Sequence, residues 1–296
     1  LFAPAAGLAV ARVLAVGRRV LPAIGAGLAI GTLAAGGGLL AAIVGAACGV
    51  AEAAIAGWIV GRIGAGTRIT SVRDVLALVL GPGLAAPLAA AVAAALLARL
   101  HGFPAEALAP SAMYAWLADS LGIVVATPLV FAWTTPRTPI SKPWTVAAPL
   151  AAHTIACALV FSGVLIGWVG HPTVAFLLIP GIVWLVIAGG TREITGAVVI
   201  LAAFALWAQA NDTGPFAAAR PMTRHGLLFA LVAISVTAAL LASATALAER
   251  AASHAMRASH DHLRALSSLS MDWFWEQDTE GRITFIAGRA IDEGRI

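Results

Sequence analysis

The chain has 296 residues, of which 60% are hydrophobic and only 11% are charged, and its mean hydropathy is +0.94. Water-soluble domains carry about 25% charged residues, so this composition excludes an ordinary soluble domain. The basic residues behind the net charge of +4 are scattered between apolar runs and form no basic stripe, so membrane topology explains them better than nucleic-acid binding does. Cys48 and Cys157 both lie inside apolar runs, and we interpret them as packing residues rather than disulfide or metal ligands.

Nine apolar segments follow one another along the chain, and each is a candidate membrane-spanning helix, which needs about 20 apolar residues. The segments are 2–16, 21–35, 39–61, 75–97, 112–133, 145–168, 174–188, 194–208 and 226–248. The first, second, seventh and eighth are short for one crossing, so we expect one or two of them to form tilted pairs or re-entrant hairpins. The sequence therefore predicts an all-α polytopic membrane bundle of about eight to ten spans.

Basic residues are distributed unequally between alternate loops of this arrangement. If the C-terminal tail is cytoplasmic, eleven of them lie on its side and three lie opposite. The eleven are Arg18, Arg19, Arg62, Arg68, Arg73, Arg137, Lys142, Arg192, Arg250, Arg257 and Arg264; the three are Arg99, Arg220 and Arg224. Because cytoplasmic loops are enriched in Lys and Arg, this asymmetry predicts a multi-pass inner-membrane protein with a cytoplasmic C-terminus.

Tryptophan positions support the predicted span boundaries. Six tryptophans lie at or near span ends, where an indole ring is favoured among lipid headgroups. They are Trp58, Trp116, Trp133, Trp144, Trp168 and Trp207. Trp184 lies in the middle of a span, and we interpret it as a packing residue.

Beyond Glu249 the sequence becomes polar. A heptad-like 4-3-4-3-4 spacing predicts a helix that continues from the last span and pairs with a second subunit; the alternative is a solvated helical linker. Its members are Ala252, Met256, Ser259, Leu263, Leu266 and Ser270. An aromatic run, the turn 278–281 and a β-branched run then predict a β-hairpin, with Gly281 at positive φ. Two strands do not make a stable domain, so we expect the chain to stop inside one.

The hairpin has the pattern D-W-x-W-E-x-D-x-x-G-R over 272–282, which resembles the opening of a PAS domain. Four stretches of the membrane part are distinctive: F-A-P-A-A-G-L at 2–8; 51–61, with Glu52 and Trp58; W-L-A-D-S-L-G at 116–122, followed by T-P-L at 127–129 and Trp133; and Trp207 with N-D-T-G-P-F at 211–216. They resemble the type 1 membrane-associated sensor domain (the MASE family) that precedes histidine kinases and diguanylate cyclases.

This resemblance implies a three-part organisation. Residues 1–248 are expected to form a membrane-associated sensor domain, 249–270 a helical signalling linker, and 271–296 the N-terminal fragment of a PAS domain. The resemblance also implies one further helix before residue 1 and an output domain after residue 296, either a histidine kinase or a diguanylate cyclase/phosphodiesterase. We therefore expect no enzymatic activity, catalytic residue, metal or cofactor in this chain itself.

Two carboxylates inside predicted spans, Glu52 and Asp119, are the main candidates for function. Ionisable groups at mid-bilayer cost on the order of 2.5–3.5 kcal/mol, so their presence needs a reason. They could bind a cation, relay protons or recognise a polar ligand; alternatively, each hydrogen-bonds to a neighbouring helix or water and only fixes packing. The resemblance adds Trp116, Gly122 and Pro128, from its third stretch, as further ligand-binding or signalling candidates.

Three other polar residues receive structural interpretations. Asp74 and Glu193 each stand at the start of a span, where the helix dipole favours a carboxylate. His153 is a lone imidazole within a span, and we interpret it as a core histidine rather than a sensor or a haem ligand.

The sequence leaves three functions open. A sensor would detect a small molecule or a membrane protein and pass the signal to a homodimer through the 249–270 linker. A transporter would also use glycine-rich spans, kinked helices and buried carboxylates. A membrane anchor would only bind another membrane protein. In each case the lipid bilayer is a partner and nucleic acid is not.

Overall fold

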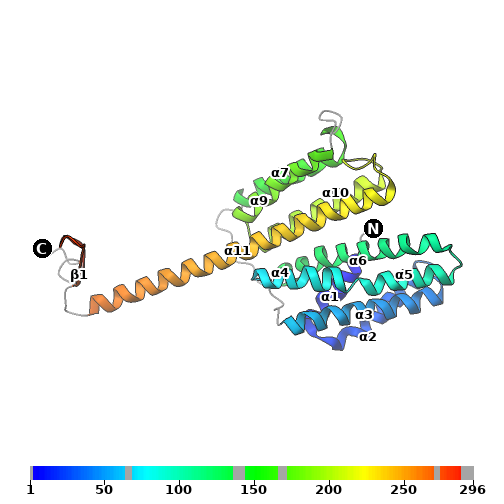
Figure 1. Ribbon diagram of the computed structural model, residues 1–296, viewed down its shortest axis with the longest axis horizontal. Helices are drawn as coiled ribbons and strands as arrows, with labels where there is room; N and C mark the ends of the chain where they lie inside the picture. Colours follow the sequence, from blue (N-terminus) through cyan, green and yellow to red (C-terminus); the bar gives the residue numbers. More distant parts are fainter. Residues whose placement is uncertain (1–2, 64–68, 136–143, 166–171, 270–273, 288–296) are drawn as a thin grey trace. The chain divides into compact units, whose positions relative to one another are not determined.

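The computed structural model describes residues 3–63, 69–135, 144–165, 172–269 and 274–287. By its internal contacts the chain divides into two compact units, Leu1–Ala246 and Leu247–Ile296. Helices make up nearly all of the first unit, and a small antiparallel sheet lies in the second (Figure 1). The predicted all-α membrane bundle is therefore confirmed.

The helices match the predicted segments closely. In chain order they are α1 (Pro4–Val16), α2 (Leu21–Ala34), α3 (Leu39–Ile63), α4 (Val72–Leu78), α5 (Leu88–Leu100), α6 (Ala105–Thr134), α7 (Trp144–Phe161), α9 (Leu178–Ala188), α10 (Thr191–Ala210) and α11 (Pro221–Leu269). Within the described residues, six helical segments are long and apolar enough to cross a membrane. They are Leu39–Ile63, Val72–Leu100, Ala105–Thr134, Trp144–Phe161, Thr191–Ala210 and Pro221–His262.

The short segments differ from one another. The eighth predicted segment is long enough to span, because α10 extends it at both ends to 20 residues. By contrast, α1 has 13 residues and α2 has 14, which at 1.5 Å per residue reach only about 20 Å. The seventh segment begins with a 3-10 turn, Pro172–Leu177, before α9.

The fourth predicted span is a broken helix. Between α4 and α5 the backbone forms a π-helical segment, Val79–Ala85, with the sequence V-L-G-P-G-L-A. Pro82 lacks the N–H that a regular helical turn needs, and the glycines on either side of it lower the helical propensity. Pro87 then lies in the turn that leads into α5. The span is therefore a single crossing made of two α-helices joined by a π turn.

Two groups of helices share the first unit. In one, α1 packs against α3 and α6, α2 packs against α3, and α5 packs against α3 and α6 (Figure 1). In the other, α7, α9 and α10 pack together, and a cluster of buried apolar residues joins them to α6 and the first half of α11. His153 of α7 lies in this second group and is only 1% exposed, with Nε2 3.6 Å from Sγ of Cys157, as a core histidine would be.

Side chains cap several helix ends. Asp74 accepts hydrogen bonds from the backbone N–H groups of Thr70 (3.2 Å) and Ser71 (3.0 Å), while Ser71 Oγ accepts from Asp74 N (3.2 Å), which completes a capping box. Glu193 likewise accepts from the N–H of Gly190 at 3.0 Å. Arg192 donates to the carbonyl of Ala132 at 2.9 Å, near the C-terminal end of α6. Both predicted N-terminal carboxylates are thus confirmed.

Removing the α4 cap is expected to weaken the bundle modestly. In Asp74→Ala the N–H groups of Thr70 and Ser71 lose their acceptor, so the free energy of unfolding should fall by about 1 kcal/mol. Denaturation in detergent micelles measures this change. Glu106→Ala, which removes an exposed first-turn carboxylate from α6, is the matched control. Equal effects of the two changes would show that the capping box does not contribute.

The second unit contains the predicted hairpin. Strands β1 (Phe274–Gln277) and β2 (Ile283–Ala287) pair antiparallel. In the turn, Asp278 Oδ1 accepts from the N–H of Glu280 (3.0 Å) and of Arg282 (2.8 Å), and Gly281 has φ of 79°. Within α11, every residue from Ala248 to His262 is exposed.

Candidate functional site

A cavity of about 290 Å³ lies between α1, α2, α3, α5 and α6. Its walls are mostly alanine and glycine. The larger side chains that line it are Leu28, Leu97, Cys48, Glu52 and Asp119. The cavity therefore contains both carboxylates that the sequence singled out, although they come from different helices.

Helical spacing explains why this space is empty. On α3 the lining residues Gly45, Cys48, Gly49 and Glu52 follow the i, i+3, i+4, i+7 pattern of a single helix face. On α5 the lining residues 90, 93, 94 and 97 follow the same pattern, and three of them are alanine. Two faces of small side chains oppose each other, so no large side chain fills the volume between them.

Glu52 is almost completely buried, with only 3% of its surface exposed. Its Oε1 atom has no hydrogen-bond partner among the described residues. Asp119 lies on a different helix, α6, and its carboxyl group is close enough to that of Glu52 to interact with it directly. None of the described residues that line the cavity is Lys, Arg or His. The site therefore offers carboxyl oxygens as hydrogen-bond acceptors, and its described wall has no basic side chain to pair with them.

Trp116 lies one helical turn from Asp119, on the same helix. Its indole N–H donates to the carbonyl of Leu84, in the π-helical segment, at 2.9 Å. Its ring packs against Phe229 of α11, with ring centroids 5.9 Å apart. Both the polar and the apolar contacts of Trp116 are with neighbouring helical segments, and its predicted position at the membrane surface stays a prediction. Trp116 joins α6 to α11 and to the π-helical segment.

Gly122 and Pro128 do not line the cavity; they lie where α1 packs against α6. A methyl group on Gly122 would lie 2.0 Å from the carbonyl oxygen of Ala3, and one on Gly7 would lie 2.2 Å from the carbonyl oxygen of Gly122. Thr127 Oγ1 donates to the carbonyl of Gly7 at 3.0 Å, beside the buried Pro128. Gly122 and Pro128 are therefore buried between packed helices and are not part of the cavity lining.

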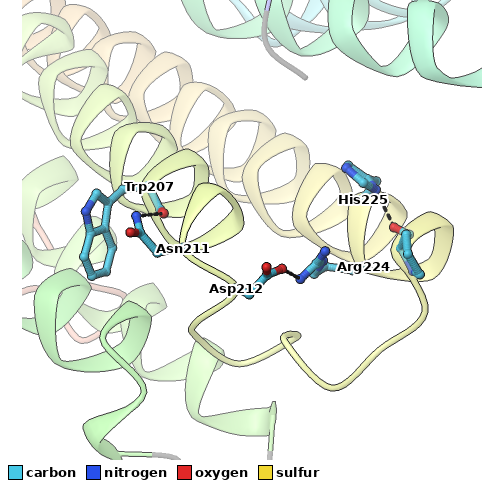
Figure 2. A network of polar contacts seen from close by, with 6 residues as sticks. Trp207, Asn211, Asp212, Arg224 and His225 are labelled. Carbon is cyan, nitrogen blue, oxygen red and sulfur yellow. Dashed lines mark hydrogen bonds and ion pairs between the residues drawn. The ribbon is translucent and has the colours of Figure 1, made fainter.

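A second polar cluster lies at the start of α11 (Figure 2). Arg224 forms an ion pair with Asp212 at 2.5 Å, and Asn211 donates to the carbonyl of Trp207 at 2.8 Å. The ring of His225 packs edge-on against Tyr114 of α6, with centroids 4.9 Å apart. This cluster ties the loop between α10 and α11 to the first turn of α11.

Sequence reasoning missed several residues around these sites. Cys48 was interpreted as packing, yet it lines the cavity one turn from Glu52. The periodic spacing of small residues on α3 was the available signal. Phe229 and His225, by contrast, have contacts with α6 that cross more than 100 residues of sequence, and no local pattern predicts them.

Comparison with known proteins gives one finding. The family model MASE1 matches residues 1–251. That range includes all the helices around the cavity and the first part of α11. No curated protein and no solved structure matches the chain.

Proposed function

Because the chain belongs to the MASE1 family of membrane sensory domains, we propose that it relays a signal from its membrane bundle to a cytoplasmic output domain. The relay element is α11, and the output follows a PAS domain that begins at residue 271. The output is a histidine kinase or a diguanylate cyclase/phosphodiesterase. The membrane part, residues 1–248, supplies the input and has no catalytic role.

The geometry of α11 carries this proposal. One helix of 49 residues, Pro221–Leu269, contains residues of both compact units. In its first half Val232, Val236, Leu240 and Ala244, each four residues apart, are buried in the bundle. Its second half is exposed from Ala248 to His262. A change in the rotation or tilt of the buried half is therefore transmitted along a continuous backbone.

The contacts of α6 connect the cavity to that helix. Asp119 lines the cavity, and Trp116, one turn away, packs on Phe229 of α11. A ligand that binds Asp119 thus acts on a side chain only three residues from Trp116, which contacts the relay helix α11 directly. Such a ligand biases the bundle toward one of two arrangements, provided that it binds one of them better.

Charged and aromatic residues support the bacterial inner membrane and a cytoplasmic C-terminus. Arg62 lies over the ring of Trp58 at 5.5 Å, and Arg192 over that of Trp133 at 5.9 Å. All four residues lie in helices, near the ends that adjoin loops assigned to the cytoplasm by the charge asymmetry. Arginine–tryptophan pairs of this kind suit the headgroup layer, because the indole enters the membrane while the guanidinium meets lipid phosphate.

A homodimer formed by the 249–270 linker accounts for the surface of the second half of α11. Met256, on the heptad-like seam, is 78% exposed in the single chain. Ala252 and Ser259, its seam neighbours, are exposed as well. A second copy packed along this seam would cover Met256, as apolar seam residues are covered in parallel coiled coils.

Insertions in α11 test the relay. One to seven alanines placed between Arg250 and Ala251 rotate the downstream helix by about 100° per residue. With the chain fused to a diguanylate cyclase output domain, we expect cyclic di-GMP synthesis to change sharply with one or two insertions. It should return to the parental level with seven, which restores the heptad phase.

The seven-residue insertion is the control for linker length, because it lengthens the helix most while keeping its phase. Output that is the same for every insertion length would contradict a relay through helix phase. In that case the membrane part would act as an anchor only.

A further inference from the structure

We propose that the cavity between α1, α2, α3, α5 and α6 binds a small organic ammonium ion, with Glu52 and Asp119 as its acceptors. This inference assigns a ligand class to the proposed sensory module, and only the consequence of binding rests on that proposed function. Binding itself depends on the cavity alone.

The first argument is that one carboxyl oxygen of Glu52 has no hydrogen-bond partner among the described residues. A buried polar atom without a hydrogen bond is rare in folded proteins, and it destabilises the fold unless a partner arrives. Oε1 of Glu52 is such an atom among the described residues, in a side chain that is 3% exposed and lines the cavity. A donor that enters the cavity would satisfy it.

The second argument is charge. Asp119 brings a second carboxyl group to the same space, and the described wall contains no basic side chain. Two carboxyl groups at close range in an apolar wall disfavour each other's ionised form, and a cation bound between them would favour it. The preferred donor is therefore positively charged.

The third argument is the composition of the wall, which separates an organic cation from a metal ion. Calcium takes six to eight oxygen ligands and magnesium requires an octahedral set, whereas the walls beside these two carboxyl groups are mostly alanine and glycine. No group of three or more His, Cys, Asp or Glu side chains suited to a metal occurs in the described parts of the chain. An ammonium group has three donors for the carboxyl oxygens, and its hydrocarbon part packs on the alanines.

Size limits the ligand further. Pockets for drug-sized molecules range from about 300 to 1,000 Å³, so a cavity of about 290 Å³ suits a compact amine. The lining residues of α3 begin six positions after Leu39, and those of α5 end three positions before Leu100. With the cytoplasmic C-terminus proposed above, on which only the direction of entry depends, these ends are extracytoplasmic, and the amine reaches the cavity from that side of the membrane.

Gly45 offers a steric test that leaves the charges untouched. A methyl group on Gly45 would meet nothing within 4 Å, although the residue lines the cavity. Gly45→Val therefore adds side-chain volume to the cavity without a clash with the backbone. It should exclude the ligand while the bundle stays folded.

The experiment measures binding of n-butylammonium to the full-length protein in lipid nanodiscs by isothermal titration calorimetry, with 1-butanol and butyrate as matched uncharged and anionic probes. Empty nanodiscs correct for partition into lipid. We expect saturable binding of n-butylammonium and no binding of the other two. Glu52→Gln and Asp119→Asn should each raise Kd about tenfold or more, because each removes a charged hydrogen-bond acceptor.

Glu106→Gln, an exposed carboxylate on α6, should bind like the parent. Gly45→Val should lose binding while its unfolding temperature stays near that of the parent. Absence of n-butylammonium binding to the parent, or equal binding by the Glu52 and Asp119 variants, would overturn the proposed site. Binding that leaves the output unchanged would instead contradict the sensory relay and leave the site in place.

Discussion

Replacing Gly122 by valine is expected to lower the free energy of unfolding by about 3 kcal/mol, the upper end of the usual cost of overpacking. The added Cβ would lie 2.0 Å from the carbonyl oxygen of Ala3, which is backbone and has no rotamer to change. To relieve this clash, α1 must move away from α6. That movement would also strain the hydrogen bond from Thr127 to Gly7. Equilibrium unfolding in mixed micelles, followed by circular dichroism, measures the loss.

The control for this change is Gly27→Val on α2, where a Cβ would meet nothing within 4 Å. We expect it to change stability by no more than about 0.5 kcal/mol. Gly7→Val should behave like Gly122→Val, because its Cβ would lie 2.2 Å from the Gly122 carbonyl oxygen. The double variant should cost less than the sum of the two, since either change alone separates the helices. Equal stability of Gly122→Val and Gly27→Val would refute the close α1–α6 contact.

Trp116→Phe is expected to uncouple the cavity from the output with little loss of stability. Phenylalanine keeps an aromatic ring against Phe229 but cannot donate to the carbonyl of Leu84, a change of about 1 kcal/mol. In the cyclase fusion, we expect the response to ligand to fall several-fold. The affinity of the cavity for n-butylammonium should stay within about twofold of the parent, because Trp116 does not line it.

Trp133→Phe is the matched control, since Trp133 lies on the same helix and is exposed. Trp116→Ala should abolish the response and also destabilise the bundle, by about 3–5 kcal/mol if the ring behaves as a core residue. A full response in the Trp116→Phe variant would show that the Trp116–Leu84 hydrogen bond does not transmit the signal. Retention of the response in Phe229→Leu as well would remove α6 from the relay.

The positions and lengths of the apolar segments were enough to predict most helices. A membrane helix must satisfy its backbone hydrogen bonds internally and expose apolar side chains to lipid, so its whole length is apolar. Glu52 and Asp119 were identified for a related reason: a carboxylate in a span is expensive and therefore informative. That they lie in one cavity follows from how α1 and α5 each pack against both α3 and α6, which no single-helix pattern encodes. Residues 64–68, 136–143, 166–171, 270–273 and 288–296 lie outside the described residues, so predictions there, including Trp168 and Ser270, stay predictions.

One interpretation of tryptophan was wrong, and one was incomplete, for a common physical reason. Trp184 was interpreted as packing but is 54% exposed in the single chain, and the contacts of Trp116 with other helices were not predicted. Lipid tails are as apolar as a protein core, so hydropathy does not separate a lipid-facing residue from a helix-facing one. Only the three-dimensional packing makes that distinction.

The π-helical segment at Val79–Ala85 has a consequence for comparison across the family. A π turn holds one residue more than an α turn, so a relative with an unbroken helix here would align only with a one-residue gap near Gly81–Gly83. On a helical wheel, the residues of α5 would then be rotated by about 100° relative to those of α4. The gap is thus expected between the part of the span that packs in the core and the part that lines the cavity. An alignment that puts this gap at another position would assign the wrong alanines of α5 to the wall of the cavity.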